Sequence, residues 1–149
     1  MYGFDFADPS DIKEWEKHKR NGYVSDYVYI KNTENKGMGV FAKKDIPTNT
    51  IIEYCYCLVF NIKKDNFSSD PKHKIYRYCY NNHEKQEIIL PLGFGIIYNC
   101  GNTLEEVNSR YFHSSDKRLF IIESFKKISK DEEILLYWGE DYYNYWCKN

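Results

Sequence analysis

Two stretches of the sequence place groups that can do chemistry at the ends of apolar runs. The first is Leu90-Pro-Leu-Gly-Phe-Gly-Ile-Ile-Tyr-Asn-Cys100, in which two glycines permit close backbone approach and Tyr98 and Asn99 supply a phenol and an amide. The second is Asp131-Glu-Glu-Ile-Leu-Leu-Tyr-Trp-Gly139, an acidic turn followed by an apolar run, two aromatic residues and glycine. If the two ends meet in space, they form a pocket with polar and aromatic walls.

The overall composition fits one intracellular globular domain. The 149 residues suit a single core. With 21 basic and 22 acidic residues, the net charge offers no general attraction to nucleic acid or to a membrane. No apolar run approaches about 18 residues, and the N-terminus lacks a basic region followed by an apolar one, so we expect neither a membrane span nor a signal peptide. The expected location is the nucleus or the cytoplasm.

Aromatic residues and cysteines are both informative. Aromatics make up 18% of the chain, with 15 tyrosines, and they either line a cleft or fill the core. The five cysteines are an odd number at scattered spacings, which favours reduced thiols over a disulfide framework. Cys55 and Cys57 share one face of a predicted strand, but a structural zinc site needs four ligands and no second pair follows. We therefore predict no metal.

Residues 1–22 are predicted to form a helical extension. Asp8-Pro9-Ser10 is a favourable helix start, because a capping carboxylate accepts bonds from free amides and proline has no donor to lose. Ile12, Trp15 and Lys19 then share one face, and Asn21-Gly22 ends the helix. The helix either packs as an N-terminal brace or binds a partner.

Residues 23–149 are predicted to be mainly β, since short runs of strand-forming residues alternate with turns. The polar residues 61–74 are expected to be a surface insert, Ile75–Tyr80 a strand or a short helix, and Asn81-Asn82 a turn. The expected strands are Tyr23–Lys31, Gly37–Ala42, Ile51–Phe60, a hairpin of 108–113 with 119–125, and Glu132–Trp138.

Three motifs in order resemble the SET domain, the fold of protein lysine methyltransferases. They are Gly37-Met-Gly-Val-Phe-Ala-Lys-Lys-Asp-Ile46, then Leu92-Gly-Phe-Gly-Ile-Ile-Tyr-Asn-Cys100, then Lys127-Ile-Ser-Lys-Asp-Glu-Glu-Ile-Leu-Leu-Tyr-Trp-Gly139. The resemblance spans about Tyr27 to Trp146 and is to the compact form without zinc-binding flanks. It implies several small sheets and a pseudoknot-like crossing, in which the segment ending at Asn99 is threaded by the C-terminal segment.

The resemblance also implies a cofactor, S-adenosylmethionine, and a protein or histone tail as substrate. Tyr137 or Tyr98 would supply an active-site hydroxyl, Tyr78 would be an aromatic residue on the substrate side, and Glu132-Glu133 would match the acidic pair before the last strand. Trp146 would cover the adenine, although plain packing is the alternative. The residues assigned to the cofactor are Gly37, Met38, Gly39, Asn99, Cys100, Trp138 and Trp146.

Methyl transfer suits these residue types. Attack of a lysine amine on a sulfonium carbon is an in-line displacement, so alignment and desolvation supply most of the acceleration and no metal is needed. The amine must be neutral. A nearby sulfonium charge and an apolar channel both lower the pKa of the amine, while a tyrosine hydroxyl and backbone carbonyls orient its lone pair.

The sequence departs from the family pattern at three places. Cys100 follows Asn99 where a histidine is usual, and Leu104–Val107 stands where a proline-asparagine pair is expected. Trp138 precedes Gly139 in place of tyrosine. Because neighbouring side chains of a strand point in opposite directions, Tyr137 can replace the missing hydroxyl only if the backbone slips or bulges by one residue.

These departures leave two functions open. The first is an active lysine methyltransferase. The second is a degenerate SET module that binds a protein tail, or the cofactor alone, without turnover. A third interpretation, a domain that binds single-stranded nucleic acid, is disfavoured because such sites combine aromatics with a basic groove that this net charge does not indicate.

Overall fold

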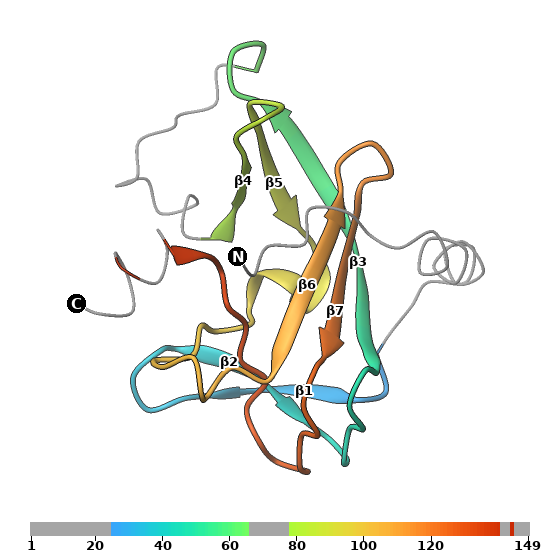
Figure 1. The fold of residues 1–149 in the computed structure, drawn as a ribbon, viewed down its shortest axis with the longest axis vertical. Coiled ribbons are helices and arrows are strands. Elements are labelled where there is room, and N and C mark those ends of the chain that lie inside the picture. Colours follow the sequence, from blue (N-terminus) through green and yellow to red (C-terminus); the bar gives the residue numbers. More distant parts are fainter. Residues whose placement is uncertain (1–24, 66–77, 141–143, 145–149) are drawn as a thin grey trace.

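The structure is a computed structural model that describes residues 25–65, 78–140 and Asn144. Two antiparallel sheets account for its strands, a two-stranded sheet of β1 and β2 and a five-stranded sheet in the order β4-β5-β3-β7-β6 (Figure 1). The mainly β fold is therefore confirmed. The strands are β1 (Val28–Asn32), β2 (Met38–Ala42), β3 (Ile51–Asn61), β4 (Tyr80–Asn82), β5 (Glu87–Pro91), β6 (Ser109–Ser114) and β7 (Leu119–Ser124), with a 3-10 turn, η2 (Gly93–Ile96), after β5.

Apart from Glu132–Trp138, the predicted strands are found with changes at their ends. The expected hairpin is β6 and β7, which pair antiparallel from Ser109 opposite Ser124 to Ser114 opposite Leu119. Asn81-Asn82 is not a turn, because both residues pair with β5 as part of β4, and the turn follows at residues 83–86. The helix predicted within residues 1–22 and most of the 61–74 insert lie outside the described residues.

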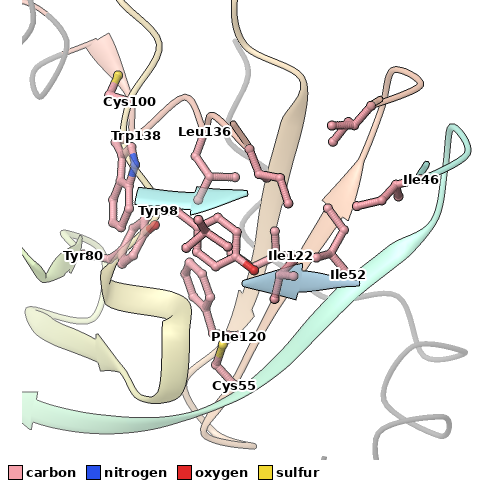
Figure 2. Close-up of a cluster of buried hydrophobic side chains, with 14 of the residues drawn as sticks. Ile46, Ile52, Cys55, Tyr80, Tyr98, Cys100, Phe120, Ile122, Leu136 and Trp138 are labelled. Atoms are coloured by element: carbon pink, nitrogen blue, oxygen red, sulfur yellow. The ribbon is translucent and has the colours of Figure 1, made fainter. Parts of the chain in front are cut away.

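The core lies between the two sheets and is built on β3. Cys55 and Cys57 of β3 belong to it together with Phe120 and Ile122 of β7, as strand alternation requires. Figure 2 shows Cys55, Phe120 and Ile122 in this core. Within residues 25–65 and 78–140, no helix has the length and apolar character that crossing a membrane requires. The same part of the chain gathers no group of three His, Cys, Asp or Glu side chains that could hold a metal ion.

The C-terminal segment, residues 132–138, is threaded through the fold. Its first half pairs with β2, where the Ile134 N–H donates to the Val40 carbonyl over 2.8 Å. Its second half lies between two other segments, since Leu136 forms parallel bridges to both Cys100 and Ser109. The predicted crossing is confirmed, but the segment is not a regular strand, because its hydrogen-bond partners change within a few residues.

Asn108 fixes the threaded segment from one side. Its Oδ1 accepts the Leu135 N–H over 2.9 Å, and its Nδ2 donates to the Glu133 carbonyl over 2.9 Å. The side chain is almost fully buried, at 3% exposure. The sequence led us to expect that Leu104–Val107 replaces the proline-asparagine pair of the family, and Asn108 stands directly after that stretch.

We predict that Asn108→Leu lowers the free energy of unfolding by about 3 kcal/mol, because a buried N–H and a buried carbonyl each lose their partner. The matched change Asn35→Leu, on an exposed loop residue, should stay within about 0.5 kcal/mol. Urea denaturation of both variants measures the difference. Equal midpoints would contradict the clamping role of Asn108.

Candidate functional site

The predicted glycine pair and asparagine meet where β2, the segment after η2 and the C-terminal segment converge. Asn99 Nδ2 donates to the Met38 carbonyl over 3.1 Å and to Glu133 Oε1 over 2.9 Å. A Cβ on Gly39 would lie 2.5 Å from that same Glu133 oxygen and 3.0 Å from Asn99 Nδ2. Glycine at position 39 is therefore a condition for the contact between Asn99 and Glu133. We call these three residues and Met38 the Asn99 junction.

The outer rim of the Asn99 junction is open and polar. Gly37 has φ +73°, and a Cβ there would meet no atom within 4 Å. Met38 is 41% exposed. The Lys36 ammonium donates to the Cys100 carbonyl over 2.7 Å. A polar cavity of about 470 Å³ lies beside the junction, with Lys36 and Glu133 among its lining residues.

A buried aromatic cluster lies on the inner side of the threaded segment. Tyr80 of β4 stacks on Trp138 with ring centroids 4.2 Å apart, and it contacts Tyr111 of β6 at 4.5 Å. Phe120 lies beneath, 5.1 Å from Tyr111. Since β4 and β6 are opposite edges of the five-stranded sheet, these rings close the curled sheet on itself. Figure 2 shows the Trp138 and Tyr80 rings adjacent.

The backbone slip that would bring Tyr137 into this cluster is not present. Ile134, Leu136 and Trp138 all belong to the buried core, so alternation is maintained through the segment. Tyr137 is half-buried and lines a largely apolar cavity of about 340 Å³, together with Val107, Phe125 and Tyr111 of the cluster. The predicted catalytic position 137 and the cluster are on opposite faces of the segment.

The other predicted tyrosines also have defined positions. The Tyr98 hydroxyl is in the core, where it donates to Glu53 Oε2 over 2.7 Å. Tyr78 is 47% exposed, whereas Tyr80, two residues later, is in the cluster. Tyrosines at 76, 78 and 80 would share one face of a continuous strand, but β4 begins only at Tyr80, so Tyr78 lies outside it. Trp146 lies outside the described residues.

A buried carboxyl that we did not single out from the sequence supports the segment that ends at Asn99. Glu53 of β3 is 7% exposed, and its Oε1 accepts the Phe94 N–H over 3.1 Å. Burial raises the pKa of the Glu53 carboxyl above its usual value, and the hydrogen bonds from Tyr98 and Phe94 offset only part of that increase. The signal in the sequence was a charged residue within an otherwise apolar strand.

Comparison with known proteins was made for the sequence and for the fold. The SET domain profile matches residues 37–139. No curated protein is significantly similar in sequence. A solved structure of a candidate histone methyltransferase from Plasmodium falciparum has a TM-score of 0.62 and 27% identity, and covers 78% of this chain and 96% of that chain.

Two solved structures of ATXR5 have a similar fold. One is a complex with monomethylated histone H3.1, has a TM-score of 0.66 and 14% identity, and covers 91% of this chain and 68% of that chain. The other is its SET domain with dimethylated histone H3, with the same TM-score and identity and 69% of that chain covered. At this identity the similarity concerns the fold alone.

We predict that Gly39→Ala displaces the Asn99 side chain, because the new methyl group overlaps the space of Glu133 Oε1. The shift is observable as a moved Asn99 side-chain amide signal in NMR spectra. Gly37→Asn is the control, since asparagine tolerates positive φ and the space there is open. If Gly39→Ala leaves the Asn99 signal in place, the close packing of the junction is not as described.

The pH dependence of stability tests the burial of Glu53. The raised pKa means that the folded chain keeps the Glu53 proton above pH 4.5, where the unfolded chain has lost it. Its contribution to stability is therefore complete below about pH 4.5 and is lost as the pH rises through the folded pKa. We expect Glu53→Gln to gain stability relative to the wild type as the pH rises through this window, measured by urea unfolding. A constant difference would contradict the raised pKa.

Proposed function

Because this chain belongs to the SET domain family, we propose that it is an S-adenosylmethionine-dependent protein lysine methyltransferase. The observation that carries the proposal is the Asn99 junction, where the glycine pair and the threaded segment meet beside a buried aromatic cluster. The junction is suited to the cofactor. The cluster is suited to the aliphatic chain and amine of a lysine.

The groups at the Asn99 junction fit the amino-acid part of the cofactor. The Asn99 amide donates through its nitrogen to Met38 and Glu133, and among the described residues its Oδ1 accepts no hydrogen bond, so this oxygen is available to a ligand ammonium group. The Lys36 ammonium, on the rim beside Cys100, can pair with the ligand carboxylate. The open backbone at Gly37 leaves room for close approach. Trp138 and the Cys100 backbone would border the rest of the cofactor.

The aromatic cluster supplies the conditions for attack by an amine. When bound, the cofactor supplies a methyl group on a positively charged sulfonium. The rings of Tyr80, Tyr111 and Trp138 exclude water, which disfavours the charged form of an entering lysine and lowers the pKa of its amine. We assign the orienting hydroxyl to Tyr111, because it is in contact with the cluster and also lines the cavity near Tyr137.

A histone tail is the substrate we propose to test first. The 27% identical Plasmodium falciparum structure is named for histone methylation, and both ATXR5 structures contain histone H3. Such a substrate would place the activity in the nucleus, and another protein tail would allow the cytoplasm. The alternative is a module that binds without turnover, favoured by the indole of Trp138 where the family has a phenol.

We predict that the wild-type chain transfers a labelled methyl group from S-adenosylmethionine to histone H3. Tyr111→Phe should lower the turnover number about 100-fold, which is the usual contribution of a positioned general acid or base. Tyr29→Phe is the control, because it removes a surface hydroxyl that donates to Asp131. Equal rates in Tyr111→Phe and the wild type would show that another residue supplies the orienting hydroxyl. Tyr137→Phe would then be the next variant to measure.

Trp138→Tyr separates the two functions. If the chain is an enzyme, the wild type turns over and the variant, which gains a hydroxyl in the cluster, is at least as fast. If the chain is a binding module, calorimetry shows that the wild type binds the cofactor, but the labelled assay shows no methyl transfer by the wild type. In that case only the Trp138→Tyr variant can show turnover. Absence of both binding and transfer in the wild type would refute the proposed function.

A further inference from the structure

Glu53 faces the core from β3, directly after a β-bulge. The pairing of β3 with β7 shifts register between Ile51 and Glu53, so one residue of β3 has no partner of its own. Ile52 lies at the bulge and is fully buried, whereas Glu53, at 7% exposure, shares the core-facing side of β3 with Cys55 and Cys57, as strand alternation requires. Bulges of this kind change the direction of a side chain and recur next to active sites. A carboxyl in a core is costly unless it is hydrogen-bonded, so its contacts need an explanation.

Both oxygens of the Glu53 carboxyl hold the chain between β5 and Asn99. Oε1 accepts the Phe94 N–H of η2 over 3.1 Å, and Oε2 accepts the Tyr98 hydroxyl over 2.7 Å. The two bonds are on either side of Ile96 and Ile97, so they fix both ends of this short segment. Asn99 follows Tyr98 directly.

The turn packs against β3 so closely that two of its positions need glycine. A Cβ on Gly93, which has φ +68°, would lie 3.0 Å from Glu53 Oε1. A Cβ on Gly95 would lie 2.9 Å from Cys55 Sγ. The glycines first noticed in the sequence therefore permit the turn to rest on Glu53 and Cys55. The described titratable groups that face the carboxyl are Tyr98, from the segment before Asn99, and Cys55, from β3.

We propose that Glu53 is a positioning residue: through η2 and Tyr98 it sets the place of Asn99, and so the affinity of the Asn99 junction for its ligand. The ligand is the cofactor, so this inference rests on the proposed function. Tyr98 acts in the same way, as part of the support and not as a group that touches substrate.

The test is a double-mutant cycle read by calorimetry with S-adenosylhomocysteine. We expect Glu53→Gln to weaken binding about tenfold, a size typical of residues coupled through a shared contact. In the Asn99→Ala background, Glu53→Gln should have no further effect, because its influence passes through Asn99. Equal effects of Glu53→Gln in both backgrounds would overturn the proposal.

A stability-matched control separates positioning from loss of fold. Ser124 is fully buried and donates to the Pro47 carbonyl over 2.7 Å, away from the Asn99 junction. Ser124→Ala should lower stability yet leave the affinity unchanged. If it weakens binding as much as Glu53→Gln does, general destabilisation explains both and the proposal fails.

Two further measurements apply if Glu53→Gln does not fold or if S-adenosylhomocysteine does not bind. Hydrogen exchange at the amides of residues 94–99 should become faster in Glu53→Gln and not in Ser124→Ala, and this requires no ligand. Tyr98→Phe, which removes only the bond to Oε2, should weaken cofactor binding and raise the cofactor KM more than it lowers kcat. A fall in kcat alone would instead make Tyr98 catalytic. No binding by the wild type, together with the predicted exchange, would refute the proposed function but support the positioning role.

Discussion

The hydrogen bonds that hold residues 132–138 in register are the constraint that decides the geometry of the site. They come from different parts of the chain, the Val40 carbonyl of β2, the Asn99 carbonyl and the Asn108 side chain. A slip of one residue would exchange the faces of Tyr137 and Trp138, because side chains alternate along extended backbone. The observed register places Trp138 against Tyr80. The chemistry of the inner face is therefore decided by backbone pairing.

This register also connects the Asn99 junction with the aromatic cluster. Ile134, Leu136 and Trp138 enter the core, while Glu133 points outward to Asn99. One short segment thus borders both the polar Asn99 junction and the aromatic cluster. Glu53 supports the other half of the junction from β3, so both partners of the Asn99–Glu133 bond are held by buried contacts.

Local sequence patterns predicted much of the fold, whereas the features set by long-range packing were missed. β2, β3 and the β6–β7 hairpin follow from apolar alternation and turns, and the crossing follows from the three ordered motifs. Asn108 was missed because the loop after Cys100 has a length that no local rule fixes. Tyr80 was not distinguished from Tyr78 because the start of β4 at Tyr80, which leaves Tyr78 outside the strand, depends on pairing with β5. Glu53 was missed because the groups that make its burial possible, the Phe94 N–H and the Tyr98 hydroxyl, come 41 and 45 residues later in the sequence.

We propose above all that the crossing of the Asn99 segment and the C-terminal segment creates a cofactor site. A crystal structure of the chain grown with S-adenosylhomocysteine would show where the ligand binds. We expect ligand density against Gly37–Gly39, with its amino-acid group beside Asn99 and its sulfur facing Trp138. Density in the cavity lined by Tyr137 and Phe125, with the Asn99 junction empty, would contradict the proposal.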